Sequence, residues 1–118
     1  MRSALLTILL VMLAGQVRAE PADTLSSDQI ATVEAGVRAS LNNPDSAKFS
    51  GLVARPINGP IFAVCGYVNA KNSSGGYVGN FAFDGFLQNN NGWSFRILVV
   101  DDPLHVSAER TCHDWGLF

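Results

Sequence analysis

The chain opens with an apolar run that is bounded by positive charge and by small residues. Arg2 precedes the run, which covers residues 4–15 and has the length of the hydrophobic segment of a signal peptide. A retained membrane anchor, the alternative, would need roughly 20 apolar residues. Val17 and Ala19 occupy the two positions that signal peptidase requires to be small or modest in size. We therefore expect a signal peptide at residues 1–19 and no membrane insertion after its cleavage.

The next part of the chain changes from a polar stretch to a helical pattern. Residues 20–25 are polar and contain a proline, so we expect a flexible tether before a single domain at 26–118. Ser26 and, three residues later, Gln29 form the pattern of a capping box. Apolar side chains then recur at spacings of three and four on one helical face: Ile30, Val33, Val37 and Leu41. The pattern predicts an amphipathic helix at about 27–41, which an Asn-Asn-Pro sequence ends.

The remainder of the domain alternates between extended apolar segments and groups of turn-forming residues. Segments rich in β-branched and aromatic residues, which are typical of strands, lie at residues 49–57, 61–70, 77–87 and 93–100. The sequence KNSSGG (71–76) predicts a hairpin with an exposed tip, and Asn91-Gly92 predicts a tight turn before the last strand. The tail carries only weak signals for a short helix. The pattern predicts an α+β domain with the N-terminal helix packed on one face of a three- to four-stranded antiparallel meander.

Two cysteines, Cys65 and Cys112, stand in the part of the chain that would be exported. Disulfides form and persist outside the cytosol, so we expect these residues to be paired and to join the tail to a strand. The alternative is that one of them is a nucleophile or a metal ligand. In the chain-entropy model, a cross-link that closes a loop of this size contributes about 4 kcal/mol to stability.

The charge balance becomes more acidic once the expected signal peptide is removed. Six basic and ten acidic residues would remain, so the net charge would change from −2 to −4. Nucleic acids and anionic lipids are bound through clustered lysines and arginines, and this sequence contains no such cluster. We therefore expect no nucleic-acid partner.

Residues of the types that bind metals are few. His105 and His113 lie near Cys112 and Asp114, which together could be imagined as a metal cluster. Their spacing matches neither a helical histidine pair nor a zinc knuckle. We therefore expect no metal and no cofactor.

Carboxylates are the residues that a hydrolase would use. A glycosidase places two of them in one cleft, and Asp84 together with Asp101 or Asp102 is the available set. Asp84 has a simpler interpretation, in which it points to solvent or pairs with Arg96 on the neighbouring strand. We therefore expect no catalytic residues, although the sequence leaves the hydrolase alternative open.

One segment combines more recognition chemistry than the rest of the chain. Residues 65–81 read CGYVNAKNSSGGYVGNF and bring two tyrosines, a lysine, several asparagines and four glycines into one hairpin. Loops of this kind on rigid strands often carry recognition. The alternative is that the glycines serve the turn and the tyrosines cover the core. The segment favours a binding role for the hairpin at 69–77.

Two motifs, PDSAKF at residues 44–49 and CGYVNAKNSSGGYVG at residues 65–79, resemble a pattern shared by small exported proteins of proteobacteria and their phages. Members of that family usually carry an aromatic residue at the position of Ser74. The resemblance runs from the N-terminal helix to the hairpin and implies export and a compact α+β domain, without an established activity. It also directs attention to the polar residues of both motifs. We expect the two motifs to lie together, with Lys48 or Asp45 ordering the loop.

The sequence as a whole favours a non-enzymatic binding or structural protein of the cell envelope, periplasmic or secreted. Its partner would be a protein or a glycan of the envelope. The candidate binding residues are Asp45, Lys48, Asn69, Lys71, Asn72, Ser73 and Tyr77. The alternative is a small cell-wall glycan hydrolase or an inhibitor of one. The sequence leaves the oligomeric state open.

Overall fold

The computed structural model describes residues 20–21 and 24–118, so the expected signal peptide at 1–19 lies outside the described residues. The elements follow one another as β1 (Glu20–Pro21), α1 (Ser27–Arg38), β2 (Lys48–Asn58), β3 (Ile61–Asn69), β4 (Phe81–Asn89), β5 (Trp93–Val100) and α2 (Ser107–Asp114). A short 3₁₀ turn at Pro44–Ser46 lies between α1 and β2. Within this part of the chain, no helix is long and apolar enough to cross a membrane.

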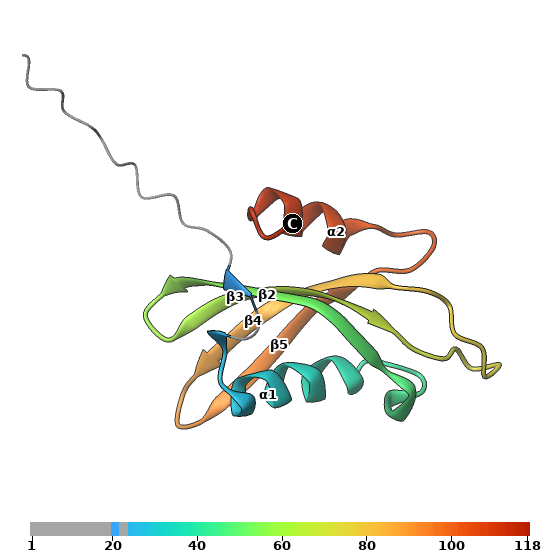
Figure 1. Cartoon of the computed structure of the whole chain (residues 1–118), viewed down its shortest axis with the longest axis horizontal. Helices are drawn as coiled ribbons and strands as arrows, with labels where there is room; N and C mark the ends of the chain where they lie inside the picture. Colours follow the sequence, from blue (N-terminus) through green and yellow to red (C-terminus); the bar gives the residue numbers. More distant parts are fainter. Residues whose placement is uncertain (1–19, 22–23) are drawn as a thin grey trace, which may run out of the picture.

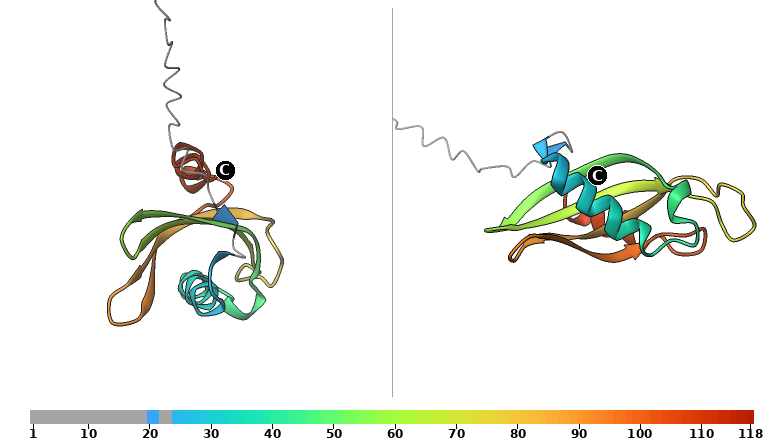
Figure 2. Two further views of the ribbon diagram at one scale, coloured as in Figure 1. Left: turned by 60° about the vertical axis from the view of Figure 1, so that its left-hand side comes forward. Right: turned by 90° about the horizontal axis from the view of Figure 1, so that it is seen from below.

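The strands form one antiparallel sheet in the order β1-β2-β3-β4-β5, so each strand pairs with its neighbours in sequence. The sheet is curved and curls around α1, which lies in its concave face, while α2 lies against the opposite, convex face (Figure 1, Figure 2). The expected α+β class, the antiparallel meander and the disulfide are confirmed. The weak helical signal in the tail corresponds to α2, which adds a second helical layer.

The first helix begins at the capping box that the sequence predicts. The Ser26 hydroxyl accepts a hydrogen bond from the Gln29 amide (3.1 Å), and the Gln29 side chain accepts one from the Ser26 amide (2.7 Å). The helix ends at Arg38, three residues before its expected end, and tight turns lead from there to the 3₁₀ turn. The core between α1 and the sheet contains Leu25, Val33, Val37, Ala54, Val64, Val68, Phe83 and Leu87.

The segment at 20–25, which we expected to be a flexible tether, is anchored at both of its described ends. Glu20 and Pro21 pair with Ala54 and Val53 of β2 and so extend the sheet by a two-residue strand. Leu25 is buried in the core beside α1. The sequence pattern did not reveal this anchoring because two paired residues and one buried leucine are too few to produce a period.

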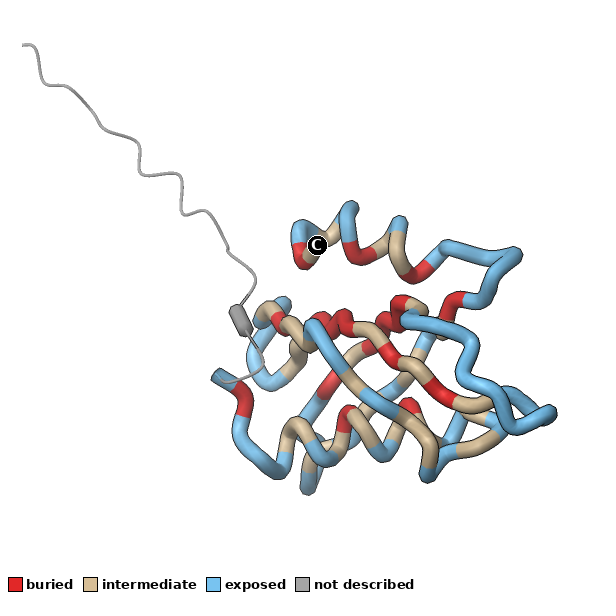
Figure 3. Tube along the Cα trace, turned by 45° about the vertical axis from the view of Figure 1, so that its right-hand side comes forward, coloured by how far each residue is buried: buried red, intermediate tan, exposed pale blue. Residues whose placement is uncertain are grey.

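The expected hairpin between β3 and β4 is present, but its strands are shorter and its loop is longer than predicted. β3 ends at Asn69 and β4 begins at Phe81, so residues 70–80 project from the sheet as a loop, yellow in Figure 1. Most of this 70–80 loop is exposed (Figure 3). Gly79 has a φ of 103°, which glycine adopts at little cost and which turns the chain just before β4.

The convex face of the sheet carries a second, smaller core beneath α2. Cys65 of β3 and Cys112 of α2 form the disulfide, and both residues are fully buried. The Trp115 ring packs on Phe86 of β4, with 5.5 Å between the ring centroids. An isolated helix of eight residues is unstable in water, so α2 depends on these tertiary contacts.

Candidate binding site

The two sequence motifs lie together, as expected, and Ser46 is the residue that joins them. Its hydroxyl accepts a hydrogen bond from the Lys71 amide (2.8 Å) and donates one to the Asn43 carbonyl (2.7 Å). Its own carbonyl accepts a hydrogen bond from the Tyr77 hydroxyl (3.0 Å). The 3₁₀ turn therefore holds both sides of the 70–80 loop where the loop leaves the sheet.

Two lysines flank the ring of Tyr77. The ammonium group of Lys48 lies 4.6 Å from the ring centroid and that of Lys71 lies 5.6 Å from it. Cation–π contacts at exposed sites contribute about 0.5–1 kcal/mol each, so they add to the Ser46 contacts in ordering the loop. Of the two residues that we expected to order the loop, Lys48 does contact it. Asp45 is exposed, and its side chain has no hydrogen bond or ion pair within the described residues.

The tip of the loop is organised by Asn72. Its side-chain Oδ1 atom accepts hydrogen bonds from the backbone amides of Ser74 (3.0 Å) and Gly76 (3.2 Å). The backbone amide of Asn72 donates to the Gly76 carbonyl. Asn69, at the base of the loop, accepts a hydrogen bond from the Gly79 amide (3.1 Å). Ser73 is exposed at the tip. Asn69 and Asn72 therefore define the shape of the loop, in addition to any role in binding.

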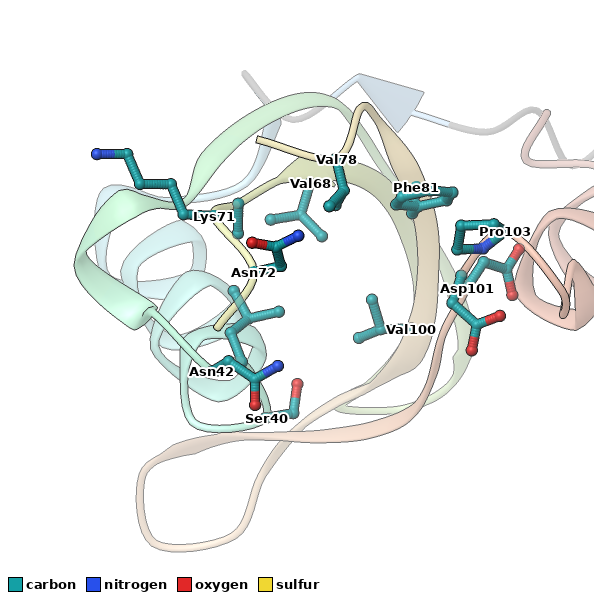
Figure 4. Close-up of a pocket in the computed structure, with 13 residues that line it drawn as sticks. Ser40, Asn42, Val68, Lys71, Asn72, Val78, Phe81, Val100, Asp101 and Pro103 are labelled. Atoms are coloured by element: carbon teal, nitrogen blue, oxygen red, sulfur yellow. The ribbon is translucent and has the colours of Figure 1, made fainter. Parts of the chain in front are cut away.

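A hollow of about 390 Å³ lies between the 70–80 loop, the turn after α1 and the end of β5. Its volume falls in the range of small-molecule sites. Apolar side chains from β3, the loop, β4 and β5 form one part of its lining: Val68, Val78, Phe81 and Val100. Uncharged polar side chains form another part: Ser40, Asn42 and Asn72. In Figure 4, Val100 and the two asparagine amides project into the same space from different sides.

The charged residues that border the hollow are engaged elsewhere. The ammonium group of Lys71 lies over the Tyr77 ring, and Figure 4 shows its side chain pointing away from the hollow. Both carboxylate oxygens of Asp101 accept hydrogen bonds from backbone amides of α2. The carboxylate of Asp102 accepts hydrogen bonds from two amides of its own loop and contacts the His105 ring. The Lys71 cation is therefore directed away from the hollow, and both carboxylates are oriented by hydrogen bonds from backbone amides.

Asp84 neither points to solvent nor pairs with Arg96, contrary to the expectation from sequence. It is 2 % exposed, and its carboxylate accepts a hydrogen bond from the Val99 amide (3.0 Å). Arg96 stands opposite Phe86 instead. Burial raises the pKa of Asp84; the Val99 amide opposes the rise and the Asp101 charge adds to it. Asp84 therefore stabilises the fold most when it is protonated, and this contribution is lost as the pH rises from the ordinary carboxyl range through the raised pKa.

The histidines do not converge on a metal site. Nδ1 of His105 lies 2.9 Å from Asp102, and Nε2 of His113 lies 3.5 Å from Glu109, in two separate exposed pairs. The Leu104 amide and the His105 ring hold the pKa of Asp102 below its usual value. In the described part of the chain there is no group of three or more histidine, cysteine or acidic side chains that could hold a metal ion.

Several residues of the hollow were missed by sequence reasoning. Ser40, Asn42 and Val100 belong to no motif, and Val78 is an apolar residue of the second motif; they meet only because the turn after α1, the loop and β5 end at the same place in the fold. Ser46 stands inside the PDSAKF motif, to whose polar residues the resemblance directs attention, but it was not among the candidate binding residues. The fold and the hollow together define a small disulfide-bonded α+β domain with a preformed concavity beside an exposed loop. No protein-family model, curated protein or solved structure in our comparisons matches this chain.

Proposed function

We propose that the protein is exported and acts as a non-enzymatic binding domain of the cell envelope, in the periplasm or secreted. The 69–77 hairpin and the hollow beside it form the binding surface, and the partner is a protein or a glycan of the envelope. The resemblance to small exported proteins stays a prediction and is consistent with this proposal.

The observation that carries the proposal is that the hollow is preformed and held from several sides. The loop is fixed at its base by Ser46 and at its tip by Asn72, so a ligand would not have to order it. Rigid sites avoid part of the entropy cost of binding. Disulfide pairing of Cys65 with Cys112 supports the export part, because such bonds persist outside the cytosol.

The contacts of the candidate carboxylates argue against the hydrolase alternative. Asp84 and Asp101 are 2 % and 5 % exposed, and both accept hydrogen bonds from backbone amides that they would have to release before acting on a substrate. Asp102 is exposed, but it lacks a second free carboxylate in a shared cleft. These contacts favour binding over glycan hydrolysis.

Export predicts a specific mature chain. Protein recovered from the native host should have the intact mass of a chain that begins at Glu20, with both thiols oxidised, because signal cleavage and disulfide formation accompany translocation. Osmotic-shock and culture-medium fractions, analysed by mass spectrometry without reductant, provide the measurement. A chain that retains Met1 and two free thiols in the cytosolic fraction would contradict the export part of the proposal.

Binding through the hollow predicts that a charge placed in its wall removes binding. Val78 lines the hollow and is 45 % exposed, so Val78→Lys should leave the fold intact and lower retention on isolated native envelopes by about tenfold or more. Co-sedimentation of the purified protein with washed envelopes, scored against free protein, measures the retention.

The matched control is Ile57→Lys. Ile57 is 51 % exposed and lies in β2 near its far end, away from the 70–80 loop. This variant introduces the same charge in place of a similar side chain, so it should be retained like the unaltered protein. Equal loss in both variants, or loss with Ile57→Lys alone, would remove the binding role from the hollow.

A further inference from the structure

The side-chain amide of Asn72 is oriented by the loop itself. Its Oδ1 atom accepts hydrogen bonds from the Ser74 and Gly76 amides, which fixes the oxygen and leaves the Nδ2 group on the other side of the amide. Within the described part of the chain, Nδ2 has no hydrogen-bond partner. Figure 4 shows this side chain directed into the hollow. Asn72 therefore offers a donor whose position is set before any ligand arrives.

Further uncharged groups lie beside this donor. The side-chain amide of Asn42 is exposed at the hollow and has no hydrogen-bond partner among the described residues. The Ser40 hydroxyl donates its proton to the Val37 carbonyl (2.7 Å), which leaves its oxygen able to accept. These groups supply donors and acceptors without charge. Val78 and Val100 supply apolar surface in the same space.

We infer that the hollow binds an uncharged saccharide unit and that an N-acetyl group is the part recognised most strongly. This inference rests on the proposed function, because it names the ligand class of the same site. The lining offers no cation to an anionic ligand, because the Lys71 ammonium group lies over the Tyr77 ring, and the carboxylates of Asp101 and Asp102 are already held by backbone amides.

An acetamido group matches the mixed lining because it carries a methyl group and a carbonyl oxygen a few bonds apart. The methyl group fits the apolar surface of Val78 and Val100, and the carbonyl accepts a hydrogen bond from Nδ2 of Asn72. Sugar hydroxyls, which both donate and accept, suit the amide of Asn42. An apolar side chain of a peptide would fill the hollow but would leave the oriented Asn72 donor without a partner, at a cost in affinity.

Two neutral trisaccharides that differ in the acetamido group test this inference. N,N′,N″-triacetylchitotriose, called chitotriose below, carries the group on every unit, and cellotriose has a hydroxyl in its place. Titration of the disulfide-bonded protein with each, followed by amide and side-chain NMR shifts, should give saturable binding that is about tenfold stronger for chitotriose. The largest shifts should fall on the Asn72 and Asn42 side-chain amides and on the Val100 methyl groups.

Asn72→Asp is the sharpest variant, because the carboxylate keeps an oxygen that can accept from Ser74 and Gly76 but has no donor. Chitotriose binding should weaken by about tenfold. The matched control is Asn89→Asp, because Asn89 accepts from the Gly92 amide (3.0 Å) in the distant β4–β5 turn. This control should bind like the unaltered protein. An unchanged amide shift of Gly79, which donates to Asn69 and not to residue 72, establishes that the loop of the Asn72 variant keeps its shape.

The outcomes separate the inference from the proposed function. Absence of saturable saccharide binding, equal affinity for the two trisaccharides, or equal binding by the Asn72 and Asn89 variants would overturn the inference. If envelope retention nevertheless depends on Val78, the binding function stands and the ligand belongs to another class, such as an apolar peptide. If retention does not depend on Val78 either, both proposals fail.

Discussion

Replacement of both Cys65 and Cys112 by alanine is expected to lower the free energy of unfolding by about 4 kcal/mol. The bond joins residues separated by 47 positions, and in the chain-entropy model a loop of this length restricts the unfolded chain by that amount. Small domains have total stabilities of about 5–15 kcal/mol, so the loss is a large share of the whole. Urea denaturation followed by circular dichroism measures the effect.

The double alanine variant is preferable to a single one because it leaves no free thiol to form intermolecular bonds. The unaltered protein, denatured with and without a reductant, is the matched comparison and should show the same difference. In a background with Trp93→Phe, fluorescence of Trp115, which packs on Phe86, reports separately whether α2 leaves the sheet. Equal denaturation midpoints with and without reductant would mean that α2 is held without the covalent bond.

Much of the fold could be predicted because its signals are local. The capping box and the apolar positions of α1 repeat within one element, and four strand segments stand between clear turn formers. The disulfide could be predicted because the sequence contains only two cysteines and we expect the chain to be exported. The start of β4 was placed four residues too early, because Tyr77 and Val78 have strand propensity but belong to the loop that Ser46 holds.

The burial of Asp84 could not be predicted from the sequence, although the face of the sheet on which its side chain lies could. Alternation along β4 puts Asp84 on the face opposite to Phe83, which lies in the core beneath α1. Whether that face meets water depends on α2, whose sequence gave only weak signals and which reaches the sheet through a distant disulfide. The same reason applies to the hollow, whose residues come from separate elements and share no spacing. The loop beside the hollow could be predicted because the turn-forming residues of the loop are contiguous in the sequence.

Asp101 fixes the start of α2 in a way that no local pattern indicates. Val106, the residue at the N-cap position, provides no side-chain hydrogen bond. Asp101, which precedes Val106 in the chain, supplies the missing acceptor. Its carboxylate accepts hydrogen bonds from the Ala108 amide (2.7 Å) and the Glu109 amide (2.8 Å). A negative charge at this end of a helix also suits the helix dipole. Because Asp101 is only 5 % exposed, water cannot easily replace it.

Asp101→Ala is therefore expected to destabilise the protein by about 2–3 kcal/mol, because two amides near the sheet lose a charged acceptor. Denaturation midpoints measure the loss, and hydrogen exchange at Ala108 and Glu109 should accelerate more than exchange in β3. Asp102→Ala is the control. The Asp102 carboxylate accepts hydrogen bonds only within an exposed turn, so this substitution should have a much smaller effect. In the chain without the disulfide, the effect of Asp101→Ala should shrink, because both groups hold the same helix and their contributions are coupled. Equal losses in the two backgrounds would mean that Asp101 and the disulfide stabilise the fold independently, and that α2 is not the element they share.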